Sequence, residues 1–267
     1  MPNDLIEFWR QSHFRKPPFA HPADLEVLQT YTRWIEDDAV DFESYISGPR
    51  FASGDDDRFH LSLLPAPYAG DLEHADFIIL LLNPGFSYTD YWGETHMREF
   101  RERLLSNLSQ QFDKTEYGFL FLDPQFCWHS GFVWWEKKFR ELVQEIARLK
   151  FNGNYRDALK EFSHRIASVE LVPYHSSSFH EHGIIDRLPS VAKVRNFVQH
   201  DLVPAARAGK KTIIITRQAK AWGLTGDKEN IVVYEGGHTR GASLSPRSAG
   251  GKAILRHYAR RVDDSAT

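Results

Sequence analysis

Asn83 stands where the sequence presents a polar side chain at the end of a buried strand. It follows the apolar run Phe77–Leu82, which predicts a strand covered on both faces. Pro84 and Gly85 come next, and these residues bend the chain and let its backbone approach a ligand. The Asn83 amide is therefore a candidate for contact with a bound molecule. The structural alternative is that it caps a turn.

His238 occupies a similar place after a second predicted strand, Ile231–Tyr234. It lies in the segment GGHTRGASLSP, where Arg240 and several small hydroxyl residues follow it. In parallel sheets ligands bind beyond the carboxyl ends of the strands. An amide and an imidazole from two such ends could converge on one small planar ligand. The alternative is that His238 is an ordinary loop histidine.

Other familiar loop chemistries do not fit the sequence. The run PRSAGGKA has Pro246 in place of the first glycine of a Walker phosphate loop and Ala253 in place of its Ser or Thr. The segment Gly241–Ser245 ends in serine, where a nucleophile elbow needs its final glycine. No GxGxxG segment follows a strand, so we expect no cofactor.

Three neighbouring histidines raise the question of a metal ion. His175, His180 and His182 lie in the segment YHSSSFHEHG. Their spacing matches no common zinc pattern, and sequence-local histidines of this kind usually form a polar loop surface. We therefore expect no metal site.

The cysteine content and the apolar runs indicate the compartment. Cys127 is the single cysteine, and it cannot form an intrachain disulfide, a four-cysteine iron–sulfur cluster or a cysteine-rich zinc site. A reducing compartment fits best. The N-terminal residues contain no uninterrupted apolar stretch of the secretory kind, and no run approaches the roughly 20 residues that span a bilayer. We expect a cytoplasmic protein without a membrane partner.

Two features of the composition suit a nucleic-acid partner. Residues 187–267 contain 15 Lys and Arg against 6 Asp and Glu, whereas residues 1–186 contain 18 against 30. A basic C-terminal third is typical of a phosphate-binding face. Aromatic residues make up 13% of the chain, enough to stack on planar ligands as well as fill a core. The alternative is a solvated helix surface and a ring-rich core.

Strands that alternate with helices predict an α/β domain, a three-layer sandwich around a short, mostly parallel four-stranded sheet. The expected strands are Phe77–Leu82, Ser168–Val172, Thr212–Ile215 and Ile231–Tyr234. The expected helices are Met97–Phe112, Trp135–Lys150, Tyr155–His164, Ser190–Ala208 with an interruption near Pro204, and Arg247–Val262. The carboxyl ends of these strands lead into segments 83–88, 173–178, 216–219 and 236–245, which we expect to surround the site.

Residues 1–70 are expected to form a helical and loop extension packed on this domain, which comprises residues 71–267. Leu25, Leu28, Trp34 and Ile35 lie near helical spacing and predict a helix over Asp24–Ile46. A turn-rich acidic loop that includes Asp55–Asp57 follows.

Several segments, taken in order, resemble the uracil-DNA glycosylase superfamily. LLLNPG is similar to its first motif, in the Asn form of the mismatch-specific branch, and GGHTRGASLSP is similar to a diverged last motif. SGFVWWEKKFREL, VELVPYHSSS and KKTIIITRQAKAWG resemble the segments between them. The resemblance spans roughly residues 74–262. The last motif departs from the family pattern because Thr239 and Arg240 replace Pro and Ser, which places catalysis in question.

The resemblance implies hydrolysis of the N-glycosidic bond of a deaminated or damaged, uracil-like base that is flipped out of DNA. It assigns Asn83 to positioning the attacking water. It assigns His238, as a neutral imidazole, to a hydrogen bond with the base oxygen that gains negative charge, a contact of a kind worth about 2.7–4 kcal/mol. An amide is no strong general base, so we expect slower chemistry than in branches that use Asp.

The same resemblance supplies the remaining expected contacts. Phe86 and Phe126 are candidates to stack on the base, with Tyr91 and Trp128 behind them, and His175 is a candidate to read its edge. Leu244 is a candidate wedge into the vacated stack. The expected phosphate contacts are Arg240, Ser243, Ser245, Arg247 and Lys252. Each ring has ordinary core packing as its alternative.

Three other functions stay open. A non-catalytic member would bind nucleic acid or a nucleotide with an affinity that falls with salt, and would release no base. A hydrolase or transferase of free nucleosides or nucleotides would turn over mononucleosides at least as fast as DNA. A purely structural module would hold Asn83 and His238 farther apart than about 12 Å, the span of one base with a hydrogen bond at each edge.

Overall fold

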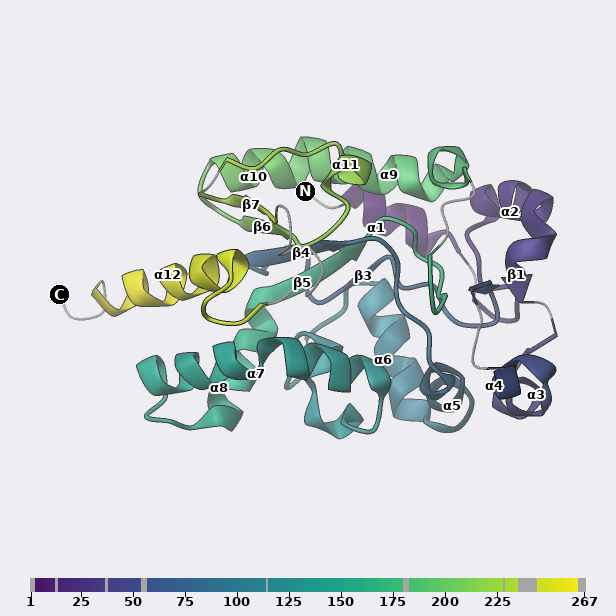
Figure 1. Ribbon diagram of the computed structural model, residues 1–267, viewed down its shortest axis with the longest axis horizontal. Coiled ribbons are helices and arrows are strands. Elements are labelled where there is room, and N and C mark those ends of the chain that lie inside the picture. The colour runs from purple at the N-terminus through teal and green to yellow at the C-terminus, as the bar shows by residue number, and fades with distance from the viewer. Residues whose placement is uncertain are drawn as a thin grey trace.

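The computed structural model describes residues 3–12, 14–36, 38–53, 57–113, 115–179, 183–227, 229–234 and 244–263. Its centre is a five-stranded sheet in which the strand order is β3-β5-β4-β6-β7 (Figure 1). The strands are β3 (Tyr68–Ala69), β4 (Phe77–Leu81), β5 (Ile166–Glu170), β6 (Thr212–Ile215) and β7 (Ile231–Val233). β4 to β7 run parallel, which confirms the α/β class and the mostly parallel sheet.

A fifth strand joins the sheet that the sequence predicts with four. β3 pairs antiparallel with β5, with Tyr68 opposite Val169 and Ala69 opposite Ser168. Two residues carry too little periodicity to be recognised as a strand, so pairing with β5 defines β3. Because β3 lies at positions 68–69, the expected extension of residues 1–70 contributes one strand to the central sheet.

The register brings the carboxyl ends of the parallel strands to one edge. Phe77 of β4 is opposite Ile166 of β5 and Thr212 of β6, so the three strands start in step. The chain leaves β4 for β5 on one side and later returns to β6 on the other. Ligands of open α/β sheets bind in the crevice where the strand order reverses in this way. This rule places the expected ligand position beyond the ends of β4 and β6.

Helices lie against both faces of the sheet because its apolar side chains alternate between them (Figure 1). Ile78, Leu80 and Ile215 pack toward α1 (Asn3–Arg10), α9 (Pro189–Phe197) and α10 (Val203–Arg207). Phe77, Ile79 and Ile214 pack toward α7 (Ser130–Lys150), α8 (Tyr155–Arg165) and α12 (Ala249–Asp263). Full burial of one such side chain contributes about 1.5–3 kcal/mol.

The expected helix over Asp24–Ile46 is wrong. The structure instead has α2 (Pro22–Leu28), a 3-10 helix (Gln29–Trp34), β1 (Ile35–Glu36) and α3 (Phe42–Ser47). Tyr31 has non-helical backbone angles, and Asp41 starts a new helix through a capping box with Ser44. β1 pairs with β2 (Phe59–His60) in a small separate sheet. Local capping and this pairing override the helical spacing of the apolar residues.

The helices expected over 97–112, 135–150, 155–164 and 247–262 are observed as α6 (Arg98–Leu108), α7, α8 and α12, with ends that differ by up to five residues. The structure also has α4 (Pro49–Ser53), α5 (Tyr88–His96) and α11 (Ala219–Trp222), with 3-10 helices at Leu120–Leu122, Pro124–Phe126 and Ile185–Arg187. The interruption expected near Pro204 is a π-helix, Val198–Leu202, that ends two residues before the proline. Among the described residues, none of the helices has both the length and the apolar character required to cross a membrane.

Candidate functional site

The Asn83 amide has a fixed orientation at the carboxyl end of β4. Its Nδ2 donates one hydrogen bond to the carbonyl oxygen of Pro84 and another to Ser176 Oγ, each over 2.9 Å. A carbonyl oxygen can only accept, so the amide nitrogen must be the atom that faces it. Both N–H groups are therefore used inside the protein. The half-buried side chain keeps Oδ1, an acceptor without a partner among the described residues.

Ser176 holds that amide from the neighbouring strand end. Its side chain is 1% exposed, and its hydroxyl accepts from Asn83 while donating to the carbonyl oxygen of Ser178 over 3.0 Å. Because the Ser176 proton is committed to Ser178, the hydroxyl presents a lone pair to Asn83. No local sequence pattern predicts this contact, since it joins residues 93 positions apart.

The loops after β4 and β5 stay paired beyond the strands. Val172 N donates to the carbonyl oxygen of Leu82 over 2.8 Å, and Ser176 N donates to that of Pro84 over 3.4 Å. The backbone around Asn83 is thus fixed by the same kind of ladder that fixes the sheet. A polar group on such a support is held in place before any ligand arrives.

The buried His175 ring lies between two carbonyl oxygens. Nδ1 is 2.9 Å from Gly85 O and Nε2 is 3.2 Å from Leu64 O. Burial lowers the pKa of this imidazole below its usual value, against the opposing charge of Asp90. A neutral ring has one N–H and satisfies one carbonyl at a time. Both nitrogens thus face the backbone, and the reading of a base edge by His175 stays a prediction.

Phe86 belongs to an aromatic cluster formed by Tyr45, His60, Phe86 and Tyr91. Its ring stacks on His60 with centroids 3.6 Å apart, and makes edge contacts with Tyr45 at 5.2 Å and Tyr91 at 5.9 Å. Tyr91 therefore stands beside Phe86, as expected from the sequence. The Phe86 ring is half-buried and lies three residues from Asn83.

The structure does not bring Phe126 into this aromatic cluster. Its side chain is 3% exposed and packs with Phe100 and Leu120, while Trp128 packs on the same Phe100 ring. Leu244 is 1% exposed and packs with the residues under α7 and α12, so here it is not presented to a partner. Stacking by Phe126 and wedging by Leu244 both stay predictions.

The sequence analysis missed a buried Asp90–His129 pair that joins two helix N-termini. Asp90 Oδ1 is 3.1 Å from His129 Nε2, and its Oδ2 accepts from Ser87 N over 2.7 Å. His129 Nδ1 accepts from Gly131 N at the start of α7. Burial alone would raise the pKa of Asp90, but the hydrogen bond and charge of His129 hold it below its usual value. The capping pattern Ser87-x-x-Asp90 was the available signal.

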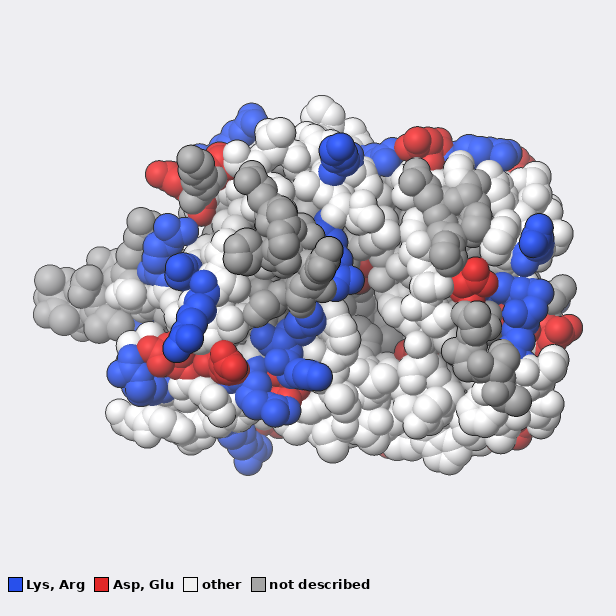
Figure 2. All heavy atoms as spheres, in the orientation of Figure 1, with Lys and Arg blue, Asp and Glu red and all other residues white. Residues whose placement is uncertain are grey.

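Positive charge gathers at Lys137, Lys138 and Arg217, which no sequence motif singled out. Burial lowers the pKa of the Lys138 ammonium on α7, and repulsion from Arg217 and Lys137 lowers it further. Arg217 follows β6 by two residues, so this charge lies beyond the end of that strand. Lys and Arg side chains also gather over the α7 and α12 region of the face in Figure 2.

The predicted phosphate contacts are only partly among the described residues. Arg247 and Lys252 have exposed side chains at the start of α12, and the Ser245 carbonyl oxygen accepts from Ser248 N. His238, Arg240 and Ser243 lie outside the described residues, as do His180 and His182 and two of the three acidic residues of Asp55–Asp57. The separation of Asn83 and His238 is therefore an open prediction.

Two further polar groups are buried at the same sheet edge. Glu170 ends β5 opposite Leu81, and burial raises its pKa well above the usual value. Its Oε2, like Oγ1 of the buried Thr216 after β6, has no hydrogen-bond partner among the described residues. An acid within the apolar stretch SVELV was the sequence signal for this group.

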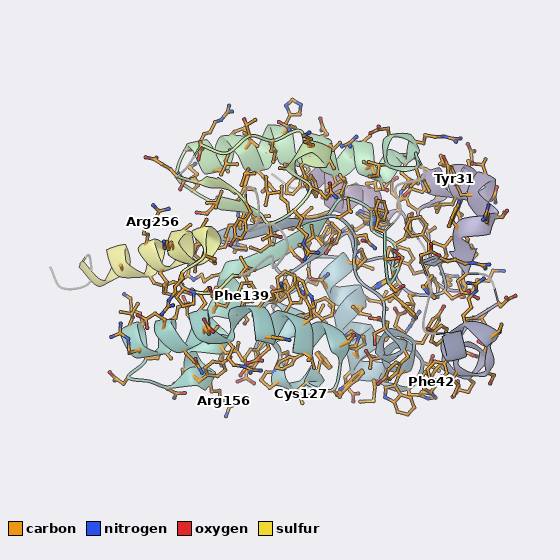
Figure 3. The ribbon with its side chains drawn as sticks, in the orientation of Figure 1. Tyr31, Phe42, Cys127, Phe139, Arg156 and Arg256 are labelled. Carbon is orange, nitrogen blue, oxygen red and sulfur yellow. The ribbon has the colours of Figure 1, made fainter. Side chains whose placement is uncertain are left out.

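A cavity of about 620 Å³ lies apart from Asn83, between α6 and the segment 115–126. Its lining includes Arg103, Asp123, Phe126 and Arg156 of α8, and Figure 3 labels Arg156 near the lower edge of the molecule. Four acidic and two basic side chains line it, which does not favour a polyanion. In the part of the chain that the structure describes, no three His, Cys, Asp or Glu side chains group as metal ligands.

Comparison with protein-family models, curated proteins and solved structures finds no match to this chain.

Proposed function

We propose that the protein is a DNA glycosylase-like hydrolase with the three-layer architecture of the uracil-DNA glycosylase superfamily. The observation that carries the proposal is the Asn83 amide. Its nitrogen is fixed by Pro84 and Ser176, so its oxygen is left as an acceptor at the end of a central parallel strand. The strand order β5-β4-β6-β7 supports the same assignment, because it reverses beside β4 and ligands of such sheets bind beyond the strand ends at that point.

The chemistry follows from what an amide oxygen can do. A nucleotide flips out of the stack, and Asn83 Oδ1 accepts a hydrogen bond from the water that attacks C1′ of its sugar. The bond between C1′ and the base nitrogen breaks, a bond from C1′ to the water oxygen forms, and the displaced water proton ends on the departing base. Asn83 orients the water and takes no proton, which suits a dissociative reaction in which the sugar carries positive charge.

His238 supplies the second interaction in this proposal. As a neutral imidazole it donates a hydrogen bond to the base oxygen that becomes negative, as the resemblance implies. The buried Glu170, whose pKa is raised by burial, and the buried Thr216 lie at the same sheet edge. The hydrogen-bonding groups of these two side chains suit a polar, planar ligand at that edge.

The alternative is a weak or inactive member that binds nucleic acid or a nucleotide through the same site. The observation in its favour is the combination of an amide, which is no general base, with the positive charge of Lys137, Lys138 and Arg217. This alternative predicts salt-sensitive binding without base release.

The test uses labelled oligonucleotides that carry uracil, hypoxanthine or xanthine, as single strands and opposite each normal base. Alkali-labile breaks report abasic sites, and a His238→Ala variant is run alongside. We expect breaks with the wild type and a loss of about 10²-fold or more in the variant. Folded wild-type protein that binds these strands but leaves all of them intact would overturn the hydrolase and favour the binding protein.

A further inference from the structure

The first two turns of α7 expose apolar side chains to solvent. Val133 is 56% exposed and Trp134 is 44% exposed, whereas Trp135 and Phe139 on the opposite side are buried against the sheet. Figure 3 shows Phe139 between α7 and the sheet. A surface helix normally turns polar residues outward, so a protruding indole beside a valine indicates a contact site.

A second exposed ring lies close to this surface. Tyr88 is the first residue of α5 and is 54% exposed. The next residue, Thr89, donates to Ser130 Oγ over 2.9 Å and accepts from Ser130 N, so the N-termini of α5 and α7 touch. Because the Asp90–His129 pair fixes the same junction, Tyr88 is held beside the start of α7.

Cations accompany these rings. The Lys138 ammonium lies 5.1 Å from the centroid of the Trp134 ring, and its pKa is lowered by burial and by the charges of Arg217 and Lys137. Clustered positive charge beside exposed rings complements a polyanion. Arg217, two residues after β6, extends this charge toward the end of that strand, where the proposed reaction takes place.

We propose that Tyr88, Trp134, Lys137, Lys138 and Arg217 form a stacking surface for single-stranded nucleic acid. Unpaired bases stack on the Trp134 and Tyr88 rings, and the phosphates between them contact the three cations. This inference deepens the proposed function by naming a single strand as the substrate form, and it rests on that function for the reaction alone. Binding of an undamaged strand requires no base release.

A double helix does not suit this surface. Its bases are already stacked and paired, so exposed rings gain little from contact with its outside, whereas every unpaired base offers a free face. An apolar protein partner would use Val133 and Trp134 but gains nothing from three clustered cations. Rings together with cations therefore favour a single strand over both.

The test measures binding by fluorescence anisotropy, with a labelled, undamaged oligothymidine of about 16 nucleotides and the full-length protein at several salt concentrations. Trp134→Ala removes the ring and Lys138→Ala removes one cation. Trp34→Ala is the matched control, because Arg33 lies 5.2 Å from the Trp34 ring centroid in the 3-10 helix that follows α2. Circular dichroism checks that each variant is folded.

We expect affinity to fall about tenfold in Trp134→Ala and to stay unchanged in Trp34→Ala. Lys138→Ala should reduce the slope of log affinity against log salt by about 0.7. Three outcomes would each overturn the proposal. Trp134→Ala and Trp34→Ala could bind oligothymidine with equal affinity, or the wild type could bind duplex as tightly as the single strand. The third is a protein dimer that dissociates in Trp134→Ala while oligothymidine stays unbound. Strand binding without base release would overturn the proposed hydrolase activity but support the stacking surface. Base release together with unaltered strand binding in Trp134→Ala would support the hydrolase and overturn the stacking surface.

Discussion

The loop after β4 leads into α5, whose start contacts the start of α7, yet this loop and the exposed side of α7 are built in opposite ways. The Asn83 nitrogen and the backbone around it are bonded within the protein, through Ser176, through the carbonyl of Pro84 and through the ladder to β5. On α7 the Trp134 indole and Lys137 are exposed to solvent. The first arrangement suits a reaction that needs one fixed geometry, and the second suits a chain whose sequence and conformation vary.

The largest expected effect comes from the pair that joins these two regions. Asp90→Ala removes the partner of His129 and the cap of α5, so we expect a loss of about 3–5 kcal/mol in the free energy of unfolding. Urea denaturation measures it. Glu102→Ala is the control, because its pair with Arg98 is exposed and should change stability by less than about 1 kcal/mol. Similar losses in both variants would mean that the junction of α5 and α7 does not depend on the buried pair.

Variants of Ser176 distinguish two roles for this side chain: orienting the Asn83 amide, or only filling space beside it. In Ser176→Ala the Asn83 nitrogen loses one acceptor, so the amide can turn, and we expect kcat for base release to fall about tenfold with KM unchanged. Ser176→Thr keeps the hydroxyl and should restore most of the rate. Steady-state kinetics on a uracil-containing single strand measure both parameters. A change in KM with kcat unchanged would contradict the positioning role, and so would a Ser176→Thr variant that is as slow as Ser176→Ala.

Glu170 gives a pH-dependent effect on stability. Its pKa is raised in the folded protein, so the folded state keeps a proton that the unfolded state loses above about pH 4.5, and its contribution to stability falls as pH rises from there. Glu170→Gln removes this dependence. We expect the variant to match the wild type near pH 4 and to become progressively more stable than it toward pH 7.5. Urea denaturation across this range would contradict the assignment if the difference stayed constant or changed sign.

Phe86→Leu should have the smallest effect on stability, through the support that the aromatic cluster gives the loop after β4. Phe86→Leu keeps an apolar side chain but loses the stacked contact with His60 at 3.6 Å. We expect a loss of about 1 kcal/mol in the free energy of unfolding. If base release also falls more than about tenfold, Phe86 contacts the flipped base in addition to the loop.

Local sequence patterns predicted those helices and strands whose apolar side chains are buried in the same way along the whole element. β4 and β6 are continuous apolar runs stopped by Asn-Pro-Gly or by a polar segment, and the expected ranges lie within one residue of those observed. The α7 stripe was recognised from Phe139 onward, although the helix begins five residues earlier than expected, at Ser130. Thr212–Ile215 was predicted without error.

The rest of the site depends on contacts between distant residues. Ser176 and His129 act on Asn83 and Asp90 from positions 93 and 39 residues away, and no local spacing encodes such pairs. Glu170 and Arg217 follow from strand order, which decides which loops become neighbours. The failed helix over Asp24–Ile46 has the opposite cause, because apolar spacing there was overruled by the cap at Asp41 and by pairing of β1 with β2.

Single-turnover kinetics measure whether Asn83 Oδ1 positions water for base excision. Wild type and Asn83→Ala would be compared on a uracil-containing single strand, with enzyme in excess and binding measured separately. We expect base release by the wild type and a rate lower by about 10²-fold or more in the variant, at unchanged affinity. Release at the same rate by both proteins would contradict it.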